Sequence, residues 1–157
     1  MIPKEIEKLL KGKIAHADHP RELVVDAMLA LQEHYGYLSD EAVKQTAELV
    51  GMSALQVEEL ATFYTFIYRE PVGKYVIHVC DSLICWMDGY ESVKNVLCQK
   101  LQIEVGGTSA DGLFTLLPVC CIGYCDRSPA MLINREVYGD LTAEKIDQIL
   151  EKLRSEA

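Results

Sequence analysis

The sequence predicts an α+β protein in which a small N-terminal helical bundle precedes an α/β domain. Two observations carry this prediction: apolar residues recur at helical spacing through residues 1–70, and short β-favouring runs alternate with helical segments after them. Between the two patterns, residues 69–73 combine charge with the turn formers Pro71 and Gly73. We therefore expect a helical domain over residues 1–70 and an α/β domain over residues 71–157.

Four helices are expected in the first domain, each bounded by residues that favour helix starts or stops. The fourth is apolar enough to be mostly buried, either in the core of the bundle or against the other half of the chain or a partner. The expected helices cover residues 2–11, with Pro3 near the start and Gly12 after the end, residues 20–35, ended by Gly36, residues 39–50, capped by Ser39 and ended by Gly51, and residues 53–64, opened by a capping box of Ser53 and Gln56.

The second domain is expected to follow the order β-α-β-β-β-α. Its elements are strands at residues 75–79, 114–117, 131–133 and 136–138, a helix at residues 88–100 with Asp88 and Glu91 as its capping pair, and a final helix capped by Thr142. The first strand leads to Cys80 in a strand-to-helix loop that also holds Cys85. This order, with a cysteine loop after the first strand, predicts a thioredoxin-like domain.

The charge and hydropathy of the sequence argue against binding to nucleic acid and against insertion into a membrane. Fifteen basic against twenty-four acidic residues give a net charge of -9, which repels nucleic acid and anionic membrane surfaces. No stretch reaches the roughly 18 to 20 uncharged apolar residues that a membrane helix needs. The first residues have no apolar signal-peptide core, so we expect a cytoplasmic protein with reduced thiols. A protein partner or a small redox centre is the expected function class.

Two close cysteine pairs, Cys80 with Cys85 and Cys121 with Cys125, can converge on one metal centre. A disulfide framework is not expected in a reducing compartment, and the four-residue spacing of the first pair differs from the C-x-x-C of dithiol oxidoreductases. Four thiolates can hold structural zinc. They can also hold an iron-sulfur cluster, which accepts longer loops and needs backbone N–H donors of the kind that a turn at Gly123 supplies. The cysteine runs of plant-type and bacterial ferredoxins are both missing.

Spacing alone leaves the second pair ambiguous. Cys120 is adjacent to Cys121, and Cys120 with Cys125 would repeat the spacing of the first pair. Cys98, in an apolar helical stretch, is expected to be a buried small hydrophobe. His78 is expected to be an exposed or hydrogen-bonded strand residue and not a ligand.

The cysteine loops and their neighbours resemble a known family over nearly the whole chain. The matching stretches are Ala61-Thr62-Phe63-Tyr64, Pro71-Val72-Gly73, Cys80-Asp81-Ser82 through Cys85, Gly112 through Pro118, and Cys121-Ile122-Gly123-Tyr124-Cys125-Asp126 with Pro129. They resemble the thioredoxin-like 2Fe-2S ferredoxins that serve as the E subunit of bacterial NADH:quinone oxidoreductase, respiratory complex I, and as its mitochondrial counterpart. The resemblance implies a helical domain before a thioredoxin-like domain with one 2Fe-2S cluster, and it names the ligands as Cys80, Cys85, Cys121 and Cys125, leaving Cys120 out.

The resemblance also implies a role in electron transfer. A cluster held by four thiolates has no open coordination position, so no catalytic residue is expected, and such ligation favours a low reduction potential, about -400 mV in plant-type ferredoxins. The chain has no G-x-G-x-x-G motif, so FMN and NADH are expected on a flavin-carrying partner subunit. The implied location is the cytoplasmic peripheral arm of a bacterial membrane-associated complex. The same module serves NAD-linked hydrogenases and formate dehydrogenases, and a zinc-stapled scaffold is the alternative of a different class.

Overall fold

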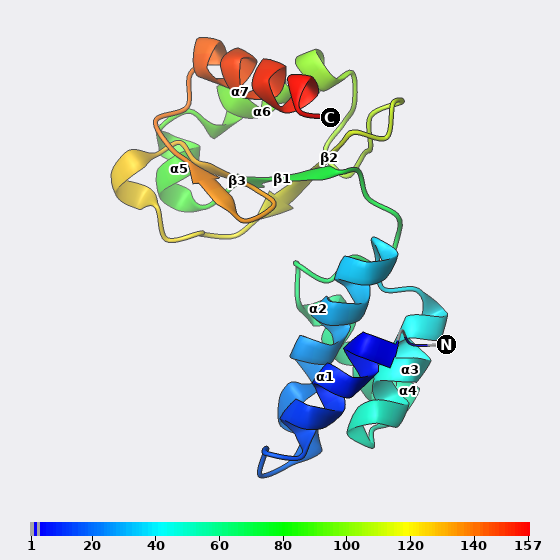
Figure 1. Ribbon diagram of the computed structural model, residues 1–157. Helices are drawn as coiled ribbons and strands as arrows, with labels where there is room; N and C mark the ends of the chain where they lie inside the picture. The colour runs from blue at the N-terminus through cyan, green and yellow to red at the C-terminus, as the bar shows by residue number, and fades with distance from the viewer. Residues whose placement is uncertain (1, 3) are drawn as a thin grey trace. The chain divides into compact units, whose positions relative to one another are not determined.

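The computed structural model describes residue 2 and residues 4–157, and it contains two compact units, Met1–Pro71 and Val72–Ala157 (Figure 1). Helices make up the regular structure of the first unit, and the second combines a four-stranded sheet with helices. The predicted α+β class is therefore confirmed. Among the described helices, none combines the length and apolar content that a bilayer-spanning segment requires.

The first unit follows the helix starts and stops that its sequence predicts. Gly36 and Gly51 end two helices in the left-handed conformation, with φ of 83° and 66°. Ser53 and Gln56 form a complete capping box. The elements are α1 (Lys4–Ile14), the 3-10 helix η1 (Pro20–Leu23), α2 (Val24–Tyr35), α3 (Asp40–Val50) and α4 (Ala54–Phe63).

The first helix does not stop at Gly12, so that expectation was wrong. Helix α1 continues to Ile14, and the N–H of Ala15 still donates to the carbonyl of Lys11 at 3.0 Å. Ile14 packs against the core of the bundle, and this contact outweighs the roughly 1 kcal/mol that a glycine costs inside a helix. The expected role of Pro3 at the helix start lies outside the described residues.

Replacing Gly12 by alanine is expected to raise the free energy of unfolding by about 0.5 to 1 kcal/mol. A Cβ at this position would meet no heavy atom within 4 Å, so the substitution gains helix propensity without a clash. Urea denaturation followed by circular dichroism measures the change. A loss of stability would contradict a helix that runs through residue 12.

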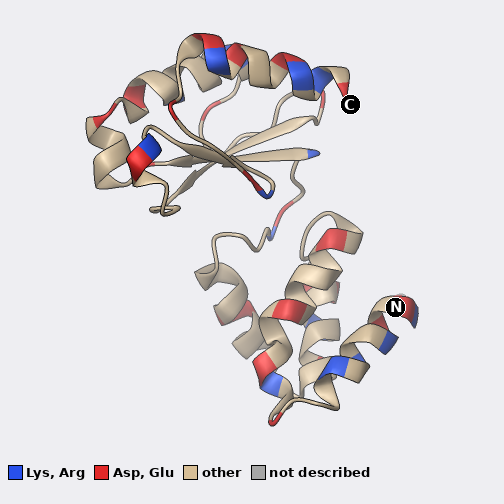
Figure 2. Cartoon of the chain, turned by 60° about the vertical axis from the view of Figure 1, so that its left-hand side comes forward, with Lys and Arg blue, Asp and Glu red and all other residues tan. Residues whose placement is uncertain are grey.

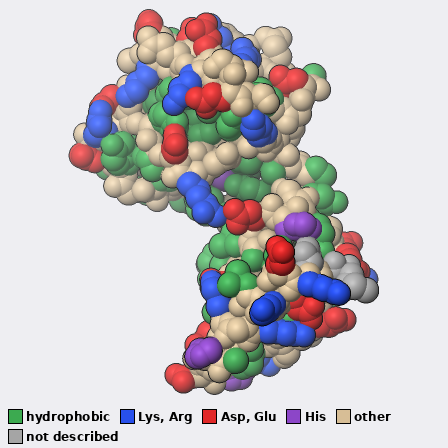
Figure 3. Space-filling model, viewed as in Figure 1, with side chains coloured by type: hydrophobic (Ala, Val, Ile, Leu, Met, Phe, Trp, Pro, Cys, Tyr) green, Lys and Arg blue, Asp and Glu red, His purple; other side chains and the backbone are tan. Residues whose placement is uncertain are grey.

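Helix α4 is largely exposed in this chain, so the expectation that it is mostly buried in the core of the bundle was wrong. Its buried residues are Val57 and Ala61, one turn apart on a single face. The other faces carry large apolar side chains, because Phe63 is 75% exposed and Leu55 is 69% exposed. Figure 3 shows hydrophobic side chains at the surface of both units.

The second unit has the predicted order of strands and one helix that the sequence did not reveal. The sheet order is β2-β1-β3-β4, with β1 parallel to β2 and the other neighbours antiparallel. The additional helix, α5, has only five residues. The elements are β1 (Tyr75–Cys80), α5 (Leu83–Met87), α6 (Tyr90–Leu101), β2 (Phe114–Val119), the 3-10 helix η2 (Cys125–Arg127), β3 (Met131–Ile133), β4 (Glu136–Tyr138) and α7 (Ala143–Ser155).

Helices α6 and α7 lie side by side over the sheet (Figure 1). Buried residues of these helices, such as Leu97 and Ile146, form one core with Ile77 and Phe114 from the two parallel strands. Strands β1, β2 and β3 contain no charged residue, and Figure 2 shows both signs of charge on the helices instead. These three strands therefore form an apolar layer, and the ends of β1 and β2 set the positions at which the cysteine loops begin.

Asp88 and Glu91 do not form the expected capping pair at the start of α6. Gly89, at a φ of 118°, precedes α6 without a side-chain cap. Asp88 instead ends α5, and its carboxylate accepts a hydrogen bond from the Ser128 hydroxyl. Because α5 ends at Met87, the next helix begins only at Tyr90, and the Asp88 side chain bonds to Ser128, three residues after Cys125.

Candidate metal centre

Parallel pairing of β1 with β2 brings the two cysteine loops to the same edge of the sheet. Cys80 is the last residue of β1 and pairs with Val119, the last residue of β2. Parallel strands have their carboxyl ends at one edge, so the segments that follow them start side by side. In Figure 1, α5 and the yellow segment around η2 lie at this end of the sheet.

The four predicted cysteines interact with one another as two pairs. The sulfur atoms of Cys121 and Cys125 are 3.5 Å apart. Cys85 is hydrogen-bonded to Cys80, and burial together with negative charge on Cys125 raises the pKa of the Cys85 thiol. Cys80 and Cys85 are each only 2% exposed, whereas Cys121 is exposed and Cys125 is half-buried. The structure thus places one pair inside the protein and the other nearer to solvent, and the two pairs are close enough for the charge of Cys125 to act on Cys85.

The protein environment shifts the pKa values of three of these thiols. Burial raises the pKa of Cys85 to about 11, and the hydrogen bond with Cys80 acts in the same direction. The backbone N–H of Gly123, followed by the hydrogen bond with Cys125, lowers the pKa of Cys121, and the pKa of Cys125 is raised chiefly by its bond to Cys121. Cys85 is therefore protonated at neutral pH in the metal-free protein, and a metal that binds it must displace a proton.

One sulfur of each cysteine pair accepts a backbone N–H. The N–H of Gly123 donates to Cys121 Sγ at 3.4 Å, and Gly123 has a φ of 80°, a conformation that a residue with a side chain rarely adopts. A second N–H, from Ala130, bonds to the Cys85 sulfur. The donor predicted at Gly123 is present. The donor at Ala130 was missed, because an ordinary alanine gives no sequence signal for the direction of its N–H.

The donor set and the spacing of the second pair suit a thiolate-bound metal centre. A tetrahedral metal with metal–sulfur bonds of about 2.3 Å holds two sulfur ligands about 3.8 Å apart, close to the 3.5 Å between Cys121 and Cys125. Thiolates select zinc, copper(I) and iron-sulfur clusters among biological metal groups. Within residue 2 and residues 4–157, no three His, Cys, Asp or Glu side chains are grouped tightly enough to hold a single metal ion.

The remaining cysteines and His78 are placed differently from the four paired thiols. Cys120 is exposed and directly follows the last residue of β2. Cys98 is half-buried in α6 and packs against the core, close to the expectation of a small buried hydrophobe. His78 is completely buried in β1, so it is not an exposed strand residue.

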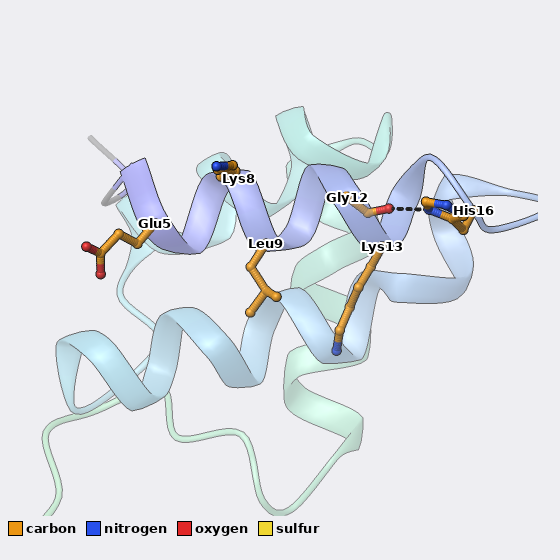
Figure 4. A pocket seen from close by; sticks show the side chains of 6 residues that line it. All are labelled: Glu5, Lys8, Leu9, Gly12, Lys13 and His16. Carbon is orange, nitrogen blue, oxygen red and sulfur yellow. Dashed lines mark hydrogen bonds between the residues drawn. The ribbon is translucent and has the colours of Figure 1, made fainter.

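A depression in the surface of the first unit does not resemble an active site. Its lining comes from one helix, α1, and the turn after it (Figure 4). His16 Nδ1 lies 2.8 Å from the carbonyl oxygen of Gly12, so one of its two ring nitrogens is already hydrogen-bonded to the backbone of the preceding turn. The residues that line the depression are Glu5, Lys8, Leu9, Gly12, Lys13 and His16. No nucleophile and base converge among them.

Comparisons with known proteins point to one family. The family model for thioredoxin-like [2Fe-2S] ferredoxins matches residues 10–154. The E subunit of the NADH-quinone oxidoreductase of Pseudomonas aeruginosa is 40% identical over 142 residues, 90% of this chain and 86% of the relative. The E subunit of Escherichia coli strain K12 is 39% identical over 92% of this chain and 87% of the relative, and that of Buchnera aphidicola from Acyrthosiphon pisum is 40% identical over 96% and 93%.

A solved structure has the same fold over most of this chain. The NAD+-reducing [NiFe]-hydrogenase in the air-oxidized state aligns with a TM-score of 0.71 and 27% identity, over 83% of this chain and 23% of the hydrogenase chain. This chain therefore spans about a quarter of that larger polypeptide. With the family model matched over nearly all of its length, and with relatives about 40% identical, the chain belongs to the thioredoxin-like [2Fe-2S] ferredoxin family.

Proposed function

We propose that this chain is an electron-transfer subunit that holds one 2Fe-2S cluster on Cys80, Cys85, Cys121 and Cys125. The observation that carries the proposal is the meeting of two thiol pairs at the carboxyl ends of β1 and β2. Two separate pairs suit a two-iron group, with one pair for each iron, better than they suit a single ion. When bound, the cluster supplies one-electron redox chemistry.

The protein itself contributes shielding and charge compensation. Burial of Cys80 and Cys85 keeps water from the inner pair. The N–H groups of Gly123 and Ala130 offset thiolate charge, which raises the reduction potential relative to the same ligands without such donors. We assign these tasks to a cluster domain of residues 71–157 and treat residues 1–70 as a helical domain. No residue of the chain is proposed to be catalytic.

We propose NADH:quinone oxidoreductase as the host, because the relatives carrying that name match most of both sequences. FMN and NADH would then bind to a partner subunit, and this chain would exchange electrons with the flavin in the cytoplasmic peripheral arm. Helix α5 supports docking to such a partner. It carries Cys85 on its buried side, whereas Leu83, Trp86 and Met87 are 69%, 57% and 69% exposed.

A hydrogenase host is a second candidate, favoured by the likeness to the NAD+-reducing enzyme. A formate dehydrogenase host rests on the resemblance of the sequence alone. Copurification of the native chain with its neighbours separates the candidates, since each complex brings different subunits. Recovery with quinone-reducing subunits supports the first host, and recovery with a nickel-iron subunit supports the second.

Metal analysis and spectroscopy of anaerobically purified protein test the proposed cofactor. We expect two irons per chain, visible absorption that is bleached reversibly by dithionite, and an EPR signal from the reduced form at low temperature. The zinc-stapled scaffold predicts colourless protein with stoichiometric zinc and no bleaching. That second result would end the electron-transfer proposal.

A further inference from the structure

Residues 139–141, between β4 and α7, form a support for the segment that follows Cys125. The N–H of Asp140 donates to the carbonyl of Arg127 at 2.7 Å, and the N–H of Leu141 donates to the carbonyl of Pro129 at 3.1 Å. Lys145 of α7 donates in turn to the carbonyl of Gly139 at 2.5 Å. The backbone of residues 127–129 is therefore bonded to residues 140 and 141, and Gly139 is in turn bonded to α7.

The same two segments are joined by an ion pair. Arg127 Nε and Nη2 lie 2.7 Å and 2.5 Å from Asp140 Oδ2. The third nitrogen, Nη1, donates to the Tyr124 hydroxyl at 3.3 Å, and the guanidinium carbon lies 5.8 Å from the centre of the Tyr124 ring. One guanidinium thus holds Asp140 and the residue just before Cys125 at once.

The fit between these segments leaves no room for a side chain at residue 139. A Cβ at Gly139 would lie 2.5 Å from the carbonyl oxygen of Arg127 and 2.7 Å from Cε1 of Tyr124. Asp140 has a φ of 49°, in the left-handed region that aspartate and asparagine tolerate better than most residues. The turn from Tyr124 to Arg127 therefore has a fixed partner surface.

We propose that Arg127 and Asp140 are positioning residues that hold the turn from Tyr124 to Arg127, and with it Cys125, in the place that the cluster requires. The inference rests on the proposed 2Fe-2S function. Exposed ion pairs contribute little to global stability, so the effect of this one is expected at the loop that it supports. Outer contacts that orient metal ligands typically change metal affinity by about 10- to 100-fold when they are removed.

The test uses the full-length chain with Asp140→Asn and Arg127→Lys. Asparagine keeps the size and the left-handed tolerance of Asp140 but loses the charge, and lysine keeps the charge of Arg127 but loses the forked geometry. We expect iron release to an excess of chelator to accelerate about tenfold in each variant, with an altered EPR line shape. Because the two residues act as a unit, the double variant is expected to release iron no faster than the faster single variant.

A matched control is available in the same unit. Lys100 and Asp147 form an ion pair at 2.9 Å between α6 and α7, with side chains about as exposed as those of Arg127 and Asp140. Asp147→Asn is expected to leave iron release within about twofold of the parent. Circular dichroism of each metal-free variant checks that the fold is retained.

Release at the parent rate in both Asp140→Asn and Arg127→Lys would overturn the positioning role. Acceleration of the same size in Asp147→Asn would also overturn it, because any lost ion pair would then suffice. A parent protein that binds no iron would instead overturn the proposed function. The two failures are therefore distinguishable in one experiment.

Discussion

Replacing Cys121 by serine is expected to remove most of the iron from the purified protein. Cys121 Sγ contacts Cys125 Sγ at 3.5 Å and accepts the N–H of Gly123, and these contacts support the proposal that Cys121 is the ligand in the second loop. A serine oxygen is a harder donor than a thiolate and is neutral at physiological pH, so it is a poor ligand for the centre. Iron content, visible absorption and EPR of the variant measure the loss.

Cys120→Ser provides the control for this prediction. Cys120 is the neighbouring residue and is also exposed, so the two variants differ in position but not in chemistry. We expect Cys120→Ser to keep the iron content and the spectrum of the parent. If Cys120→Ser lost iron and Cys121→Ser kept it, the ligand assignment in the second loop would have to be exchanged.

Replacing Gly73 by alanine is expected to destabilise the second unit by about 2 to 3 kcal/mol. The new Cβ would lie 2.8 Å from both the carbonyl carbon and the carbonyl oxygen of Leu113. These are backbone atoms, and they cannot move without disturbing the start of β2. The N–H of Gly73 also donates to Thr115 Oγ1 at 2.7 Å, a bond that a shifted backbone would lengthen.

Urea denaturation with two probes measures this effect. The single tryptophan, Trp86, lies in the second unit and reports on it by fluorescence, while circular dichroism reports on both units. Gly12→Ala is the matched control, since the same substitution meets open space there. An unchanged midpoint of the Trp86 transition in Gly73→Ala would contradict the close approach of residues 73 and 113.

Local signals explain what the sequence could predict about the fold. The helix ends at Gly36 and Gly51 and the start at Ser53 depend on a few neighbouring residues, and each was predicted correctly. The continuation of α1 through Gly12 depends on the packing of Ile14 against residues far away in sequence, and it was not. Long-range contacts decided the cases in which local rules failed.

The short helix α5 was missed for a related reason. Five residues are too few for an apolar period to be recognised. Without α5, nothing in the sequence favoured a start of the next helix after Gly89 over a start at Asp88. The exposed state of Phe63 in α4 was also unpredictable, since an apolar segment does not specify which of its faces meets the core.

Cysteine spacing predicted the two pairs but not the details around them. Both spacings of the second pair were compatible with a cluster, and only the resemblance to the family preferred Cys121. The contact between Cys121 and Cys125 supports the same choice, while the ligand set itself stays a prediction. The supporting pair of Arg127 and Asp140 lies thirteen positions apart and follows no motif, so only the folded chain could bring it to notice.

The hydrogen-bond ladder between β1 and β2 limits how the chain length can vary around the cysteines. Losing one residue inside β1 would turn Cys80 to the opposite face of the sheet, because side chains alternate along a strand. The connection before β2 is itself bonded to that strand, since the N–H of Gly106 donates to the carbonyl of Leu116 at 2.7 Å and the N–H of Leu116 donates to the carbonyl of Gly107 at 3.0 Å. Changes of length are therefore expected to be tolerated neither within the two strands nor in residues 106–113, because both would shift the strand ends that carry the cysteine loops.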